Sequence, residues 1–67
     1  MNIKQLETFV WVVRLSSFSA AAERLSTTQS TISARIHDLE QDLGISLFDR
    51  AHYRARLTSK GRELVPY

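Results

Sequence analysis

Side chains that could hydrogen-bond a ligand cluster between residues 28 and 37. The cluster combines hydroxyl, amide, guanidinium and imidazole groups with one small apolar residue: Thr28, Gln29, Ser30, Thr31, Ser33, Ala34, Arg35 and His37. Such groups donate to and accept from both base edges and phosphate oxygens. Taken singly, a serine or threonine is more often a helix cap or a solvent contact. Gathered at the start of one helix, these residues favour a surface that binds nucleic acid.

The same segment offers Ser33, His37 and Asp38, the three residue types of a hydrolytic triad. Ser33 and His37 are four residues apart, but on a helix Asp38 is turned about 100° away from His37. No sequence feature indicates an oxyanion hole or a pocket, so we expect no enzyme activity. The two histidines and the acids around them are too few and too scattered for a metal site. We therefore expect neither a metal nor a cofactor.

Charge is distributed unevenly along the chain. Residues 1–49 carry four cations and six acids, whereas residues 50–67 carry five cations and one acid, within a total net charge of +2. Seven of the nine cations are arginines, whose planar guanidinium suits phosphates and guanine edges. This composition favours a nucleic-acid partner, and a solvated basic surface is the alternative.

Length and composition limit the classes of protein that this chain can represent. Its 67 residues suffice for one small core but not for two lobes with a cleft between them. Without cysteine the core must rely on helix packing, and a reducing cytoplasm is the expected location. The longest apolar run is 9–13, which is too short to span a membrane, and no signal-peptide pattern is present.

Hydrophobic spacing predicts two helices before the polar cluster. The first has apolar residues that step by three, three, one and three, the stripe of an amphipathic helix: Ile3, Leu6, Phe9, Val10 and Val13. Asn2 is placed to cap this helix, and Ser16 and Ser17 interrupt it. Ser17 can cap a second, short helix over 18–25, whose three alanines allow a neighbour to approach closely.

A polar turn over 26–28 precedes a third helix. Thr28 can cap it by accepting from the backbone N–H of Ser30 or Thr31. We expect the helix to end near Leu43, because Gly44 suits the left-handed conformation at a helix C-terminus. One narrow face of this helix is apolar: Ile32, Ile36, Leu39 and Leu43. The opposite face is small and polar, with Gln29 and Ser33 beside it: Ser30, Ala34, His37 and Gln41.

Beyond Gly44 the hydrophobic period changes. Ile45 and Leu47, and later Ala55 and Leu57, alternate with polar residues, which predicts two short strands joined by a loop of several residues around 51–54. Thr58 can then cap a fourth helix. Gly61 lowers the helix propensity of that segment, and Pro66 would normally kink or end a helix. Because the segment makes barely two turns, with the apolar Leu64 and Val65 and no closing cap, we expect residues 58–67 to be the truncated start of a longer helix.

These residues, taken in order, resemble the N-terminal DNA-binding domain of the LysR-type bacterial transcription regulators. The resemblance extends over nearly the whole chain and is carried by Ser17-Phe18-Ser19-Ala20-Ala21-Ala22-Glu23-Arg24-Leu25, Thr28-Gln29-Ser30, Ile32-Ser33, Leu39-Glu40, Leu43-Gly44, Leu47-Phe48-Asp49-Arg50, Leu57-Thr58 and Gly61. It implies a mainly α fold, a winged helix-turn-helix with a three-helix core and a two-stranded wing. The DNA-binding domain would be residues 1–57, with the helix-turn-helix over about 18–37 and the wing over about 45–57; residues 58–67 would begin a linker and dimerisation helix.

The resemblance further implies sequence-specific binding of duplex DNA, with the third helix in the major groove. It places Arg50 in the wing beside the minor groove, with Arg54 and Arg56 extending the same basic edge. Thr58 would bind a phosphate at the start of the fourth helix.

Three positions depart from the family pattern. Many members carry a basic residue where this chain has Ala34 and an amide where it has Arg35. We therefore expect Arg35 to reach a phosphate rather than a base, and His37 to supply the further base contact, with stronger binding at lower pH. Thr27 replaces a residue that is commonly Val or Ile in the turn.

LysR-type regulators are typically longer than this chain, with a C-terminal domain that senses a small-molecule effector, and they assemble as dimers or tetramers. The resemblance therefore implies a homodimer or homotetramer of the full-length protein, with the effector bound outside this segment. A protein-interaction module is the alternative function, because the first helix also has Trp11, Val12 and Leu15 along its edge.

Overall fold

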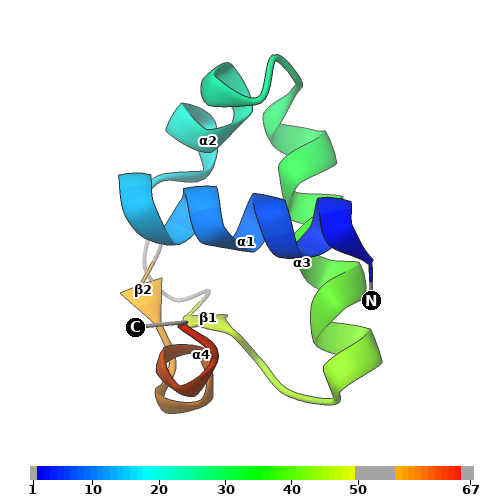
Figure 1. The fold of residues 1–67 in the computed structure, drawn as a ribbon, viewed down its shortest axis with the longest axis vertical. Helices are drawn as coiled ribbons and strands as arrows, with labels where there is room; N and C mark the ends of the chain where they lie inside the picture. Colours follow the sequence, from blue (N-terminus) through cyan, green and yellow to red (C-terminus); the bar gives the residue numbers. More distant parts are fainter. Residues whose placement is uncertain (1, 50–55, 66–67) are drawn as a thin grey trace.

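The computed structural model describes residues 2–49 and 56–65. The elements in chain order are α1 (Ile3–Leu15), α2 (Phe18–Arg24), α3 (Gln29–Leu43), β1 (Phe48–Asp49), β2 (Arg56–Leu57) and α4 (Ser59–Leu64). In Figure 1, α1 crosses in front of α3, α2 lies above α1 at the level of the upper part of α3, and the strands and α4 lie below α1. The fold is mainly α, as the sequence predicts.

The first three helices begin at the capping residues that the sequence predicts. Asn2 Oδ1 accepts from the Gln5 N–H at 2.8 Å, and Ser17 Oγ accepts from the Ala20 N–H at 3.1 Å. Thr28 Oγ1 accepts from the Thr31 N–H, also at 3.1 Å. Each bond satisfies an N–H that has no partner within its helix, and a cap of this kind contributes about 1 kcal/mol.

Among the described residues, nine apolar side chains from α1, α2, α3, β1 and the position before β1 form the core: Phe9, Val12, Ala21, Ala22, Ile32, Ile36, Leu39, Leu47 and Phe48. The Phe48 ring lies 5.7 Å from the Phe9 ring and 5.4 Å from the Phe18 ring, measured between centroids. Phe48 therefore joins β1 to both α1 and α2.

The buried face of α1 differs from the predicted stripe. Ile3 and Leu6 are 81% and 41% exposed, whereas Val12, expected at the edge of the helix, is fully buried. Thr8 is also fully buried, and its hydroxyl donates to the Lys4 carbonyl oxygen at 2.8 Å. Of the predicted stripe only Phe9 is buried, so the buried arc is turned from that stripe toward Val12 and Thr8. The polar Thr8 can lie in this arc because its hydroxyl is satisfied within the helix.

Helix α3 ends as predicted, but the first strand begins later than expected. Gly44 adopts φ +69°, and its N–H donates to the Glu40 carbonyl oxygen. The expected strand over 45–47 does not form: the Ile45 N–H donates to the Glu40 carbonyl, and the Leu47 carbonyl accepts from the Thr58 N–H. These backbone groups bond to α3 and to the start of α4 instead of to a neighbouring strand.

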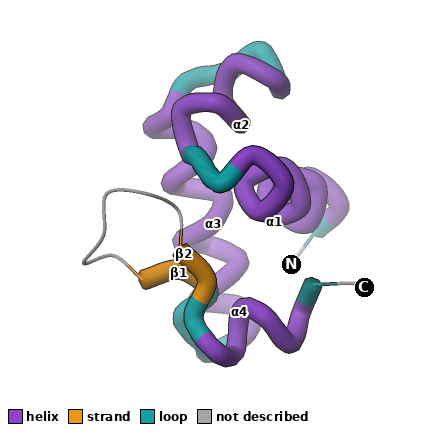
Figure 2. Tube along the Cα trace, turned by 90° about the vertical axis from the view of Figure 1, so that its left-hand side faces the viewer, coloured by secondary structure: helices purple, strands orange, loops and turns teal. Residues whose placement is uncertain are grey.

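Strands β1 and β2 pair antiparallel, with Phe48 opposite Leu57 and Asp49 opposite Arg56. The predicted loop around 51–54, and Ala55, lie outside the described residues. Figure 2 shows β2 leading through a short turn into α4 at the base of the molecule. No helix of the described segments is long and apolar enough to cross a membrane.

The start of α4 confirms Thr58 as its N-cap and gives Gly61 a reason that the sequence did not reveal. Thr58 Oγ1 accepts from the Gly61 N–H at 3.0 Å. Gly61 is buried, and a Cβ there would collide with the Leu47 carbonyl oxygen and lie 2.8 Å from Leu57 Cδ2. Gly61 thus allows α4 to pack closely against the backbone that enters β1. Pro66 lies outside the described residues.

Candidate nucleic-acid interface

The outward face of α3 carries small or polar side chains that reach solvent. Gln29, Ser30, Ala34 and His37 are exposed, and Ser33 is half-buried. A helix whose outer face lacks bulky side chains can enter a groove of B-DNA about 12 Å wide. The predicted opposition of an apolar and a polar face on α3 is confirmed by its buried side, where Ile32, Ile36 and Leu39 are fully covered.

Three of the predicted site residues come together along one groove. Ser33, Ala34 and His37 line a groove between α3 and the segment 44–46, to which Glu40 and Gln41 also contribute. The groove offers a hydroxyl, an imidazole and an amide beside one methyl group, so it can match both polar atoms and a thymine methyl. Two acidic side chains, Asp38 and Glu40, line the same groove.

The hydroxyl groups of Thr28 and Thr31 form a hydrogen bond with each other. Their hydroxyl oxygens are 2.9 Å apart, and Thr28 Oγ1 also accepts from the Thr31 N–H. One of the two hydroxyl hydrogens is therefore used within the cap, and the other is available to a ligand.

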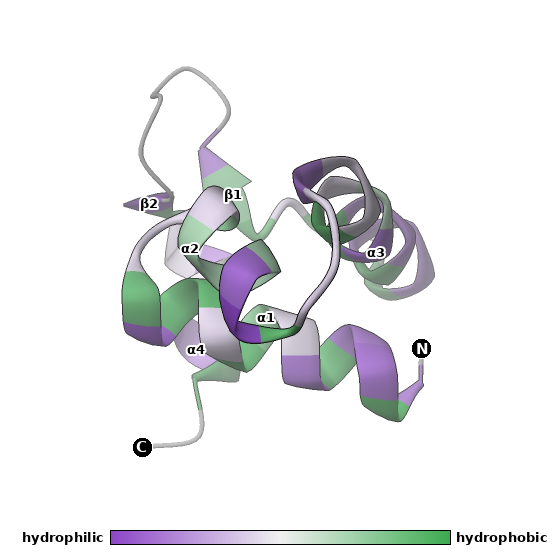
Figure 3. Cartoon of the chain, turned by 90° about the horizontal axis from the view of Figure 1, so that it is seen from above, coloured by the Kyte–Doolittle hydropathy of each residue, from purple (hydrophilic) through white to green (hydrophobic). Residues whose placement is uncertain are grey.

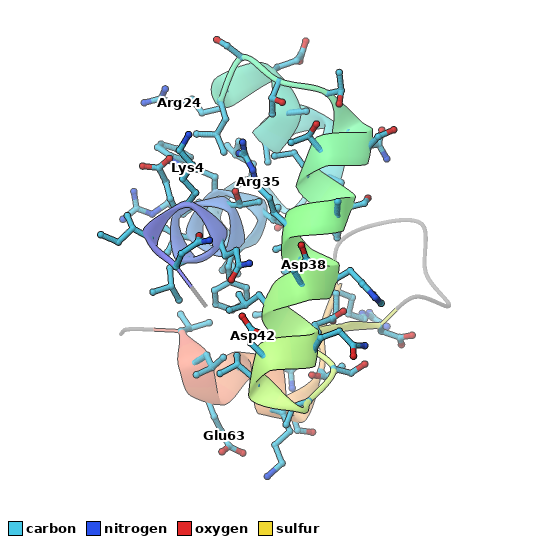
Figure 4. All side chains as sticks on the ribbon, turned by 90° about the vertical axis from the view of Figure 1, so that its right-hand side faces the viewer. Lys4, Arg24, Arg35, Asp38, Asp42 and Glu63 are labelled. Atoms are coloured by element: carbon cyan, nitrogen blue, oxygen red, sulfur yellow. The ribbon has the colours of Figure 1, made fainter. Side chains whose placement is uncertain are left out.

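Arg35 does not join the groove residues. It is half-buried on the flank of α3 that faces α1, on the side of the molecule that carries Lys4 and Arg24 in Figure 4. Ser33 and His37 line the groove on the other flank, beside the segment that leads into β1. The Arg35 guanidinium and the groove residues would therefore contact different parts of a bound ligand.

Of the predicted wing arginines, the structure describes only Arg56. Its side chain is exposed on β2, and its Cα is paired across the sheet with that of Asp49. Arg50 and Arg54 lie outside the described residues.

The Thr58 side chain, which the sequence places at a phosphate, makes two hydrogen bonds within the fold. Its hydroxyl donates its single hydrogen to the Ser46 carbonyl oxygen and accepts from the Gly61 N–H. Thr58 thereby ties the start of α4 to the segment before β1.

The sequence analysis missed the role of Glu40 in this region. Glu40 Oε2 accepts from the N–H groups of Leu47 at 2.7 Å and of Phe48 at 3.3 Å. A signal was available, because Glu40 is next to the buried Leu39 on α3 and four residues before the glycine that turns the chain. From that position on α3, a carboxylate can accept hydrogen bonds from N–H groups that follow the turn and have no partner in a helix.

Trp11 belongs to the packing between α1 and α2. Its half-buried ring lies under the Arg24 guanidinium, with 4.3 Å between the guanidinium carbon and the ring centroid, and Arg14 lies at 5.5 Å. These are cation–π contacts within the fold, one from Arg24 of α2 and one from Arg14 of α1 itself. Within residues 2–49 and 56–65, no three His, Cys, Asp or Glu side chains are grouped to hold a metal ion.

Comparisons with known proteins agree with this geometry. A family model described as "Bacterial regulatory helix-turn-helix protein, lysR family" matches residues 3–62. The chain is 46% identical over 67 residues to the HTH-type transcriptional regulator HdfR of Salmonella newport (strain SL254), covering 100% of this chain and 24% of HdfR. It therefore spans about a quarter of the length of the curated relatives that it matches.

Solved structures show the same fold. The crystal structure of VV2_1132, a LysR family transcriptional regulator, is similar with a TM-score of 0.91 and 45% identity, over 100% of this chain and 23% of that one. The CbnR DNA-binding domain, solved in complex with DNA, is similar with a TM-score of 0.88 and 36% identity, over 94% of this chain and 72% of that one. The chain thus belongs to the LysR family of bacterial regulatory helix-turn-helix proteins, and it comprises the winged helix-turn-helix domain of that family.

Proposed function

We propose that this domain binds a specific sequence of duplex DNA, with α3 in the major groove. The observation that carries the proposal is the outward face of α3, where Ser33, Ala34 and His37 line one open groove. The CbnR domain, which was solved with DNA, has the same fold and is 36% identical to this chain where the two align. Those two facts support the DNA partner without assigning a contact to any single residue.

Within this proposal, different residues contact base edges, phosphates and the minor groove. Base edges are contacted from the groove side of α3 by Gln29, Ser30, Ser33 and His37, while Ala34 contributes only apolar contact. Phosphates are bound by the hydroxyl left free at the Thr28–Thr31 pair and, from the opposite flank, by Arg35. The wing arginines Arg50, Arg54 and Arg56 contact the adjacent minor groove.

The protonation of His37 adds a pH dependence to the proposed binding. A proton on the imidazole places a positive charge next to the phosphates, so affinity rises as pH falls.

We further propose that the complete regulator is a homodimer or homotetramer in the cytoplasm. Each domain then occupies one half of an interrupted palindrome, so that the two-fold symmetry of the protein matches that of the site. A small-molecule effector would bind outside the present segment, and α4 would continue into the linker that joins the subunits.

Fluorescence anisotropy tests the proposed function. The chain is titrated against a labelled duplex with T and A flanking about eleven base pairs, and against a scrambled duplex, at several salt concentrations. We expect tighter binding to the palindrome, a steep loss of affinity with salt, and loss of the preference in a Ser33→Ala, His37→Ala double variant. Ser59→Ala, an exposed serine on α4 outside the groove, is the control and should bind as the parent does.

A protein-interaction module is the second candidate function. The residues that suggested it are partly absorbed by the fold, because Val12 is buried and Trp11 packs under Arg24. The exposed apolar side chains Ile3 and Leu6 now favour it instead. Such a module would show neither sequence preference nor a steep salt dependence toward DNA, and the same titration would then refute the first proposal.

A further inference from the structure

Glu40 bonds four backbone N–H groups within the eight residues that follow it. Its carbonyl oxygen accepts from Gly44 and Ile45, at 2.8 and 3.2 Å. Its carboxylate oxygen Oε2 accepts from Leu47 and Phe48, at 2.7 and 3.3 Å. The side chains of Leu47 and Phe48 are buried in the core, so these two N–H groups have little access to water.

The same short segment is bonded from its other side by the start of α4. The Thr58 hydroxyl donates to the Ser46 carbonyl, and the Thr58 N–H donates to the Leu47 carbonyl at 3.0 Å. Residues 46–48 therefore lie between α3 and α4 and lead directly into β1. Of these anchors, only Glu40 ties the segment to α3 through a side chain.

We propose that Glu40 is a positioning residue for DNA recognition, whose carboxylate sets the place of the two-stranded sheet relative to α3. The inference rests on the proposed DNA-binding function, in which α3 and the sheet contact the same duplex. By its charge alone, a carboxylate in this groove repels phosphates and lowers affinity. Glu40 therefore favours binding only through the geometry that its hydrogen bonds maintain.

Replacing Glu40 by alanine removes the acceptor and leaves the Leu47 and Phe48 N–H groups unpaired. A buried donor without a partner is costly, so the segment shifts toward water and β1 moves with it. The groove residues of α3 stay in place, but α3 and the sheet no longer fit one duplex together. Glu40→Gln keeps an oxygen acceptor at the same distance along the side chain without the charge.

The test measures specific and non-specific binding in parallel, by anisotropy on the palindromic and scrambled duplexes. For Glu40→Ala we expect affinity for the palindrome to fall about threefold to tenfold, with less than about a twofold change on the scrambled duplex. Glu40→Gln should stay within about twofold of the parent on both. Asn2→Ala is the stability control, because it removes the cap of α1 at the side of the molecule opposite the strands (Figure 3) and should keep the parent's preference.

Hydrogen exchange measured by NMR reports the geometry independently of DNA. The Leu47 and Phe48 amide hydrogens should exchange faster in Glu40→Ala than in Glu40→Gln, while the amides of α1 keep the parent's rates. This readout separates displacement of one segment from loss of the whole fold.

Each outcome of the binding test bears on a different claim. If Glu40→Ala keeps the parent's preference for the palindrome, the inference is overturned. If both variants bind both duplexes more tightly, Glu40 acts only through its negative charge, and the inference is again overturned. If the parent binds neither duplex, the proposed function itself is refuted and the inference with it.

Discussion

Replacing Gly61 by alanine tests how closely α4 packs against the chain that enters β1. The added Cβ would meet the Leu47 carbonyl oxygen at a distance below van der Waals contact, and Leu57 Cδ2 at 2.8 Å. The leucine side chain can rotate, but the carbonyl cannot, because the Thr58 N–H donates to it at 3.0 Å. The collision must therefore be relieved by moving α4 or the segment 46–48.

Two opposing contributions determine the size of the effect. Alanine raises helix propensity over glycine by about 1 kcal/mol, which stabilises α4. Forcing a methyl group into a packed position costs about 1–3 kcal/mol, and a backbone contact places this site at the upper end of that range. We expect the free energy of unfolding to fall by about 1–2 kcal/mol. For a domain of this size, that loss lowers Tm by about 4–15 °C.

Urea unfolding followed by circular dichroism, together with thermal unfolding, measures this change. Ser59→Ala is the matched control, because it also places an alanine in the first turn of α4 at an exposed position without a packing partner. The control should stay within about 0.5 kcal/mol of the parent. A Gly61→Ala variant as stable as Ser59→Ala, or more stable, would refute the argument that the backbone of Leu47 excludes a side chain at this position.

Two further substitutions test the packing and the bonds around the same segment. Phe48→Ala removes a buried ring that contacts Phe9 and Phe18 and should lower the free energy of unfolding by about 3–5 kcal/mol. Calorimetry should then show no cooperative transition. A transition near the parent's Tm would contradict the central place given to this ring. Thr58→Val keeps the side-chain shape but loses the N-cap and the bond to Ser46. It should lower the urea midpoint by the equivalent of about 1–2 kcal/mol, whereas Thr58→Ser should restore most of the loss. Equal midpoints for both variants would contradict the roles assigned to the hydroxyl.

Local sequence signals predicted most of the helical framework correctly. The caps at Asn2, Ser17 and Thr28 depend on hydrogen bonds between residues three apart, so their chemistry is visible without the rest of the chain. The C-terminal turn at Gly44 follows from its freedom to adopt a positive φ. The polar face of α3 was also predictable, because the apolar residues of that helix all lie within one arc.

The buried face of α1 could not be chosen from its own sequence. The apolar residues of α1 form one wide arc from Val12 through Phe9 to Leu6 and Ile3, and either end of that arc could face a core. The choice depends on where α2 and α3 lie, which is a property of the whole fold. The polar Thr8 made the correct end of the arc look less apolar, although its hydroxyl is satisfied by the Lys4 carbonyl.

The sequence itself determined where the helices begin and end and which side of α3 carries polar groups. Those features depend on residues within one or two turns of each other. The tertiary structure alone decided the bonds of the Glu40 carboxylate to Leu47 and Phe48, the bond of the Thr58 hydroxyl to Ser46, and the exclusion of a side chain at Gly61. Thr58 bonds Ser46, twelve residues away, and Glu40 bonds Leu47 and Phe48 across the turn at Gly44. Such contacts form only when packing brings separate segments together, since no local periodicity specifies which distant carbonyl or N–H will lie within reach.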